Sequence, residues 1–335
     1  MKKRNRAIGG AAEHLIRRRI ISEHEHEQEV AATLQRPDRI TVILCGTDSP
    51  LAQGGTQTCT AVFVNGQFLL FDAGNNSLAS MQASDLPLHE LDAGFITHYH
   101  NDHYADLGDV MEMSWILGRR HILPVYGPTG IAQIVDGFQS AYELEWGYRT
   151  AHHGEEVMPS EWAPSEPIEF EAPTDDAAIV IYQQNGVTVK AFRVNHPPVE
   201  PAVGYRIEYG GKIVVISGDT VPTPALLEAS RNADLLVSEV MNKEMVELLE
   251  NINREIGNTD RAIILFDIRE VHMDVSDVGA LAQEANVQHL ALNHLAPKPQ
   301  GRSQANRFFQ NPVRELFAGE ISVGEDGMQI MIPVP

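Results

Sequence analysis

The sequence has little of several features that would assign it to a specialised class of protein. Only two of its 335 residues are cysteines, Cys45 and Cys59, so it predicts no disulfide framework of the kind that small secreted proteins use. No apolar run approaches the length of a membrane span. We therefore expect no membrane partner and a cytoplasmic, reducing location.

Positive charge is also scarce, with 25 Lys and Arg against 46 Asp and Glu and a net charge of −21. A large basic surface for phosphate backbones is not expected, which counts weakly against nucleic acid as a substrate. The first twenty residues nevertheless carry a net +6, which leaves −27 for the remainder. We predict that residues 1–36 form a helical extension, basic and then acidic, that could dock on an acidic partner. Residues 37–335 should form one catalytic domain.

Histidine, by contrast, is concentrated in one stretch. Residues 97–107 hold four candidate metal ligands in the spacing H-x-H-x-D-H, namely His98, His100, Asp102 and His103. Neutral imidazoles and a carboxylate are ligands that a zinc-type ion accepts. Fourteen histidines spread over 335 residues make three within six positions an improbable accident. The stretch predicts a metal site.

Hydrophobic periodicity and turn residues place further polar groups just after apolar strands. We predict strands at 39–45, 60–64, 67–71, 122–126, 178–183, 187–194, 204–209, 212–217, 235–240 and 290–292. Helices are predicted at 104–117, 128–142, 243–256, 260–268 and 275–284, and a Pro- and Glu-rich surface loop at 155–173. Asp72, His196, Asp219 and His294 each follow a predicted strand, where a rigid scaffold can gather distant ligands.

The motifs occur in a recognisable order. They are Gly46-Thr47-Asp48-Ser49-Pro50, Phe71-Asp72-Ala73-Gly74, the H-x-H-x-D-H run, Val125-Tyr126-Gly127-Pro128, His196, Gly204-Tyr205-Arg206-Ile207-Glu208, Ser217-Gly218-Asp219-Thr220, His272 and Asn293-His294. Over residues 40–300 the chain thus resembles the metallo-β-lactamase superfamily, and within it the ribonuclease Z branch. The resemblance implies an α/β fold, the αββα sandwich of two mixed β-sheets flanked by helices, with metals at one edge between the sheets.

The resemblance also implies a dinuclear zinc centre, although the ligand types would accept manganese or iron as well. One ion would be held by His98, His100 and His196, the other by Asp102, His103 and His294, with Asp219 bridging. A metal-bridged hydroxide would then be the nucleophile. The catalytic residues would be Asp102, Asp219 and His272.

Other polar residues are expected close to this centre. Asp72 would orient a ligand imidazole, and Asp48 and Glu239 would add carboxylates beside the ligands or the substrate. His272 would contact the scissile group or protonate the leaving group. An alternative for His272 is a cap on the helix that follows it. His152 and the adjacent His153 are predicted to lie in a loop near Glu155 and Glu156, with a structural metal or a subunit contact left open.

The sequence departs from the ribonuclease Z pattern in ways that bear on the substrate. Only 22 residues separate His196 from Asp219, so the usual tRNA-gripping arm is absent there. We therefore expect a hydrolase of a small, aromatic ester, sulfate, phosphodiester, lactam or activated aryl substrate. Six residues could line its apolar pocket: Tyr99, Tyr104, Trp115, Trp146, Trp162 and Met241. The alternatives are a ribonuclease Z-type 3′-tRNA processing endonuclease and a non-catalytic metal-binding subunit. A homodimer is expected by analogy with relatives.

Overall fold

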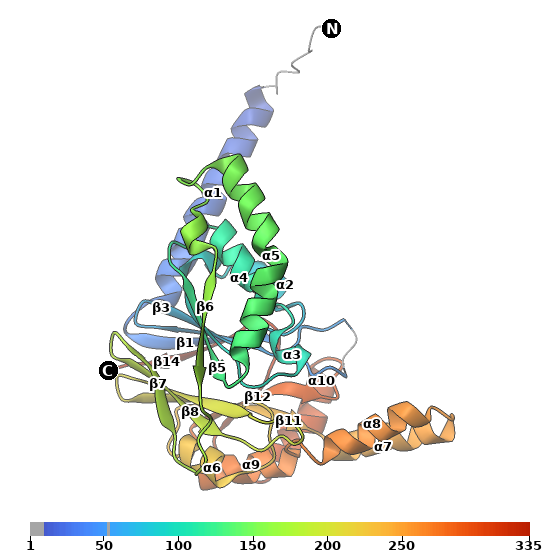
Figure 1. The fold of residues 1–335 in the computed structure, drawn as a ribbon. Coiled ribbons are helices and arrows are strands. Elements are labelled where there is room, and N and C mark those ends of the chain that lie inside the picture. The colour runs from blue at the N-terminus through green and yellow to red at the C-terminus, as the bar shows by residue number, and fades with distance from the viewer. Residues whose placement is uncertain (1–9, 52–53) are drawn as a thin grey trace.

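Two seven-stranded β-sheets are stacked face to face, with helices on both outer faces (Figure 1). The computed structural model describes residues 10–51 and 54–335. This arrangement is the αββα sandwich that the sequence predicted, so the predicted fold class is confirmed.

The first sheet has the strand order β14-β1-β2-β3-β4-β5-β6. Its strands are β1 (Arg39–Gly46), β2 (Cys59–Val64), β3 (Gln67–Phe71), β4 (Leu91–Phe95), β5 (Leu123–Pro128), β6 (Ser165–Phe170) and β14 (Met328–Pro333). The second has the order β13-β12-β11-β10-β9-β8-β7. Its strands are β7 (Ile179–Gln184), β8 (Val187–Arg193), β9 (Val203–Tyr209), β10 (Lys212–Ile216), β11 (Leu235–Met241), β12 (His289–Ala296) and β13 (Glu320–Val323).

Both faces of the central strands are buried, and their side chains alternate between two cores. On β1, Ile40, Val42 and Leu44 enter the core between the sheets, whereas Ile43 and Cys45 enter the core under the helices. Successive strand residues point to opposite faces, so one strand serves both layers. This double burial explains why the central strands are largely apolar and have no solvent-exposed face.

The helices divide between the two outer faces (Figure 1). Those packed on the first sheet are α2 (Ser77–Ala83), α4 (Leu107–Ile116) and α5 (Ile131–His153). Those packed on the second are α6 (Pro224–Ser230), α9 (Val275–Glu284) and α11 (Asn311–Arg314). Helices α1 (Gly10–Leu34), α7 (Lys243–Glu255) and α8 (Thr259–Arg269) project from the sandwich. The short helices are α3 (Asn101–Tyr104), α10 (Arg302–Ala305), η1 (Leu88–Glu90), η2 (Ser160–Trp162) and η3 (Asn306–Gln310).

Most predicted elements end within a few residues of the observed ones, but two predictions fail around residues 142–173. Helix α5 continues to His153, eleven residues past its predicted end, and the predicted surface loop contains edge strand β6. Strand β6 pairs with β5 and places Pro167 opposite Val125. Proline is tolerated there because an edge strand needs only one row of ladder hydrogen bonds.

The described helices bear on two predictions, the N-terminal extension and the absence of a membrane span. Helix α1 lies in the predicted extension, whose first nine residues fall outside the described part of the chain. Within residues 10–51 and 54–335, none of the helices combines the length and the apolar character that a membrane crossing needs.

The cysteines depart from the sequence expectation. Cys45 at the end of β1 and Cys59 at the start of β2 are joined by a disulfide, and both are fully buried. A chain assigned to a reducing compartment was not expected to form this bond. Its effect is to join the end of β1 covalently to the start of β2.

We expect the disulfide to contribute measurably to stability. Because its cysteines are 14 positions apart, replacing both by alanine should lower the free energy of unfolding by about 3 kcal/mol. Urea unfolding of the oxidised protein would measure this. Wild-type protein unfolded in dithiothreitol is the control and should approach the variant. Two titratable thiols in unreduced, denatured wild type would contradict the bond.

Candidate metal centre

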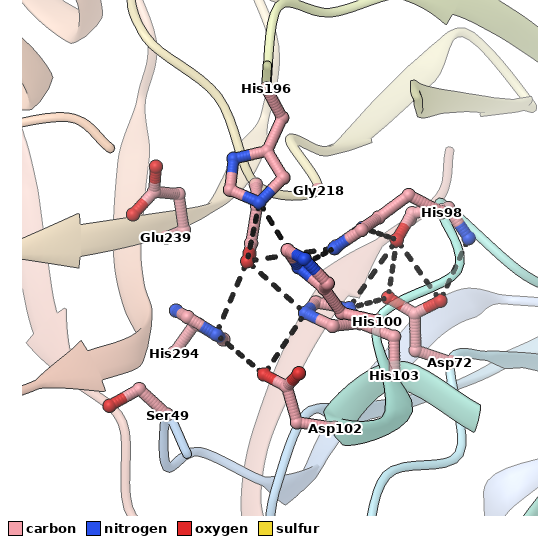
Figure 2. A network of polar contacts seen from close by, with 12 residues as sticks. Ser49, Asp72, His98, His100, Asp102, His103, His196, Gly218, Glu239 and His294 are labelled. Atoms are coloured by element: carbon pink, nitrogen blue, oxygen red, sulfur yellow. Dashed lines mark hydrogen bonds and ion pairs between the residues drawn. The ribbon is translucent and has the colours of Figure 1, made fainter. Parts of the chain in front are cut away.

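Strand ends from both sheets meet at one edge of the sandwich, and all seven predicted ligands lie there. Figure 2 labels each of them except Asp219. Their positions along the chain are after β4 (His98, His100), in α3 (Asp102, His103), after β8 (His196), after β10 (Asp219) and within β12 (His294). Each sheet thus supplies part of the site. The ligands are buried except for His100, which is half-buried.

Asp219 occupies the middle of the cluster. Its Oδ2 lies 3.3 Å from His103 Nε2 and 3.4 Å from His294 Nε2. The same oxygen lies 3.8 Å from His98 Nε2 and 3.9 Å from His196 Nε2. One carboxylate is therefore shared by two groups of ligands.

The first group consists of His98, His100, His196 and Asp219. His100 Nδ1 lies 3.2 Å from both His98 Nε2 and His196 Nε2. All potential ligand atoms of the group lie within 4.8 Å of one another. Three imidazole nitrogens and a carboxylate converging on one point match the donor set of a tetrahedral zinc-type site.

The second group consists of Asp102, His103, Asp219 and His294. Asp102 Oδ2 lies 3.1 Å from His294 Nε2 and 3.5 Å from His103 Nε2. His103 Nε2 and Asp219 Oδ1 are buried without a hydrogen-bond partner among the described residues. Buried polar atoms are normally satisfied, and a divalent cation would satisfy these. The residues present therefore fit two metal ions.

Burial and neighbouring charges set the protonation of the ligands. Burial lowers the pKa of His98 well below its usual value, and His103 lowers it further. Burial alone would raise the pKa of Asp219, but His294 and His103 outweigh it and hold the pKa well below its usual value. A neutral imidazole and an ionised carboxylate are the forms that bind a cation.

His103 differs because three carboxylates surround it. Burial lowers its pKa, but Asp219, Asp102 and Asp72 together raise the pKa well above its usual value. The carboxylates thus favour a positive charge at this position. Metal binding would supply that charge and release the proton.

Asp72 supports His103 from the side away from Asp219. It has a left-handed backbone (φ 58°) directly after β3, and its Oδ2 accepts a hydrogen bond of 2.9 Å from His103 Nδ1. The Thr97 backbone N–H and hydroxyl donate to the same carboxylate at 2.8 and 2.9 Å. Asp72 thereby leaves His103 Nε2 facing Asp219. Thr97 was missed by the sequence reasoning, since a threonine before the motif carries no distinguishing signal.

His272 and Glu239 form a buried pair beside both groups. His272 Nδ1 lies 3.2 Å from Glu239 Oε2, and the imidazole ring lies 4.9 Å from that of His196 and 5.4 Å from that of His294. Burial lowers the pKa of His272, but the charge of Glu239 raises it to about 9. The alternative role as a helix cap is wrong, because α9 is capped by Asp274 in a capping box.

The predicted apolar pocket does not form from its six residues. Trp115, Trp146 and Trp162 pack together with Met158 and Ala163 in a separate cluster. The long α5 carries Trp146 to this cluster, where its Nε1 donates to Glu112. The other three residues also pack elsewhere: Tyr99 on Pro128, Tyr104 on Phe138, and Met241 at the base of α7 and α8.

The paired histidines, His152 and His153, end α5 and are exposed. They belong to neither group of ligands, nor to any other potential metal cluster in residues 10–51 and 54–335. The sequence predicted a loop at these residues, which is wrong because α5 continues through both of them.

A buried two-centre His/Asp site at the edge of an αββα sandwich defines the class of a metal-dependent hydrolase. Known proteins agree: the Beta-lactamase superfamily domain matches residues 68–295. Ribonuclease Z of Mycolicibacterium gilvum is 31% identical over 297 residues, covering 88% of this chain and 96% of that protein. Ribonuclease Z of Mycolicibacterium paratuberculosis is 32% identical over 300 residues, covering 88% and 99%. The chain belongs to the metallo-β-lactamase superfamily, in its ribonuclease Z-like branch.

Solved structures share the fold. The metallo-β-lactamase fold protein YhfI from Bacillus subtilis superposes with a TM-score of 0.61 at 22% identity, covering 88% of this chain and all of YhfI. Human tRNase Z, short form (ELAC1), gives 0.62 at 20% identity with the same coverage. These comparisons confirm the resemblance that the motifs indicated, and they confirm the prediction that the chain is a hydrolase. The curated relatives favour the ribonuclease alternative over the small-molecule expectation.

We expect Asp72→Asn to weaken metal binding at the group containing His103. An amide cannot supply the carboxylate charge that favours the donating Nδ1–H, so affinity there should fall roughly 10- to 100-fold. Metal content after dialysis against graded zinc buffers would measure this. Asp92→Asn is the control, because Asp92 accepts from the Phe68 N–H away from the site. Equal affinities in wild type and Asp72→Asn would refute the role.

Proposed function

We propose that this protein is a metal-dependent RNA phosphodiesterase that processes the 3′ ends of tRNA precursors. The observation that carries the proposal is its similarity, at 31–32% identity, to ribonucleases Z over nearly their whole length. The convergence of all seven predicted ligands on one edge supports a working hydrolytic centre. An idle metal-binding subunit would not need His272 and Glu239 paired beside both groups.

The chain's residues have distinct parts in this proposal. His98, His100 and His196 would hold one zinc ion, Asp102, His103 and His294 would hold the other, and Asp219 would contribute its carboxylate to both groups. When bound, the two ions supply Lewis acidity and a nucleophile at neutral pH. Manganese or iron would suit the same donors.

The proton of the leaving group is handled by the chain itself. Glu239 Oε2 holds His272 Nδ1–H, which leaves Nε2 for the substrate. Glu239 favours the protonated imidazole by raising the pKa of His272, so Nε2 can donate to the departing oxygen. Glu239 is itself fixed by the N–H groups of Thr220 and Met273, at 3.1 and 3.0 Å.

A second candidate is a hydrolase of a small phosphodiester. The specific observation in its favour is that the 22 residues between His196 and Asp219, where the tRNA-gripping arm is expected, hold only short connections and the β9–β10 hairpin. The acidic composition points the same way. Esters, sulfates, lactams and activated aryl compounds have no such support.

One comparison separates the two candidates. Zinc-loaded protein should shorten precursor tRNA at its 3′ end, and the rate should fall steeply with salt because phosphates are bound. An aryl phosphodiester should be hydrolysed far less efficiently in kcat/KM. Asp219→Ala protein serves as the metal-poor control. Efficient hydrolysis of the aryl compound without tRNA cleavage would support the second candidate and overturn the first.

We expect His272→Ala to lower kcat by about 100-fold while metal content stays unchanged, since a general acid contributes about that much. Glu239→Gln should change kcat in the same direction by a smaller factor. His289→Ala is the control, because His289 contacts Ser322 away from the centre. Single-turnover cleavage of precursor tRNA would measure both rates. An unchanged rate in His272→Ala would remove the residue from the mechanism.

The expected homodimer and cytoplasmic location stay predictions. Light scattering on the purified chain would test the first, and fractionation of cells the second. A monomer that cleaves precursor tRNA would show that a second copy is not required.

A further inference from the structure

His294 has an unusual backbone for a metal-ligand candidate. It adopts a left-handed conformation with φ 46°, which non-glycine residues rarely hold. On β11, Glu239 pairs with Asn293 and Val240 pairs with Leu295, so His294 is the extra residue of a β-bulge. The sequence predicted that the strand ended before His294, whereas β12 continues to Ala296. Such a conformation persists only where the surroundings hold it.

The segment Thr47–Ser49 holds the backbone directly after the bulge. Leu295 N–H donates to the Thr47 carbonyl at 2.8 Å, and the Ser49 hydroxyl donates to the Leu295 carbonyl at 3.2 Å. Asp48 also forms an isolated β-bridge with Leu295. Since Thr47 follows β1 in the first sheet and Leu295 belongs to the second, these bonds join the two sheets beside His294.

An ion pair secures this segment. The side chain of Asp48 is only 1% exposed, and its carboxylate contacts the ammonium of Lys298. Lys298 lies four residues after His294. Gly55 makes room for the pair: a Cβ there would lie 1.6 Å from Asp48 Oδ2 and 3.0 Å from Lys298 Nζ. The Asp48 N–H donates to the Thr56 carbonyl at 2.9 Å, which orients the residue from its other side.

We propose that the Asp48–Lys298 ion pair positions His294 and thereby sets metal affinity at the group of Asp102, His103, Asp219 and His294. Only His294 in that group comes from β12, whereas Asp102 and His103 belong to α3 beyond the first sheet. The distance between His294 and the pair Asp102 and His103 therefore depends on the contact that residues 47–49 make between the two sheets. The first group draws nothing from β12 and should be insensitive. Lys298 is thus a positioning residue.

Removing the Lys298 ammonium should affect the metal affinities of the two ligand groups differently. In Lys298→Met we expect zinc affinity to fall roughly 10- to 100-fold at one site and to stay unchanged at the other, the size expected when support of a ligand is lost. Competition with a chromophoric chelator would give both dissociation constants, and cobalt spectra would report the changed coordination. Lys298→Arg should restore both affinities.

Two further variants guard against a general loss of stability. Asp48→Asn should reproduce Lys298→Met, and the double variant should be no worse than either, because both act through one pair. Lys212→Met is the matched control: Lys212 pairs with Asp234 at 2.9 Å, at the end of β10 away from Asp219. It should leave both metal affinities unchanged. Thermal unfolding of each metal-free variant confirms folding.

The outcomes are distinct. One weakened site in Lys298→Met and Asp48→Asn, with rescue by arginine, supports the proposal. Equal weakening of both sites, or wild-type affinity at both, overturns it. A raised KM with both affinities unchanged also overturns it, and would assign Lys298 to substrate binding. None of these results depends on whether the substrate is tRNA or a small phosphodiester.

Discussion

The site depends on one shared carboxylate. Asp219 Oδ2 lies within 3.9 Å of four imidazole nitrogens, from His98, His103, His196 and His294. A positive charge on any of these buried imidazoles, or on a metal ion bound between them, needs a negative charge close by, and Asp219 supplies it. The two ligand groups meet at Asp219, and its place after β10 requires both sheets to end at the same edge.

The backbone around the site is bent to serve this geometry. Asp72 and His294 both have positive φ, one directly after β3 and the other in the bulge of β12. Neither is glycine, so each conformation carries a cost that neighbouring bonds offset. Thr97 and His103 donate hydrogen bonds to the Asp72 carboxylate. The Thr47 carbonyl accepts a hydrogen bond from Leu295, the residue after His294. Rigid sheets on either side hold both strained residues in a single conformation, and a metal centre needs ligands held in fixed positions.

Much of the site was predictable because its signals are local. The four ligands of the H-x-H-x-D-H motif lie within six consecutive residues. Asp219 and His294 could be identified as polar residues near the ends of apolar runs. What failed depended on contacts between distant segments. Strand β6, which contains Pro167, becomes a strand only by pairing with β5, and the tryptophans leave the predicted pocket because α5 is longer than its pattern suggested. Lys298 carries no pattern that marks it as the partner of Asp48.

By itself the sequence determined the chemistry: residue types and spacing specify imidazole and carboxylate ligands, and the order of motifs specifies the superfamily. The resemblance already implied how these ligands divide into two groups, and the tertiary structure forms the second group by bringing Asp102 and His103 to His294 across two sheets. Only the tertiary structure decided that His272 pairs with Glu239 instead of capping α9. Local spacing encodes which atoms are available, whereas distances between segments remote in sequence arise from packing of the whole sandwich.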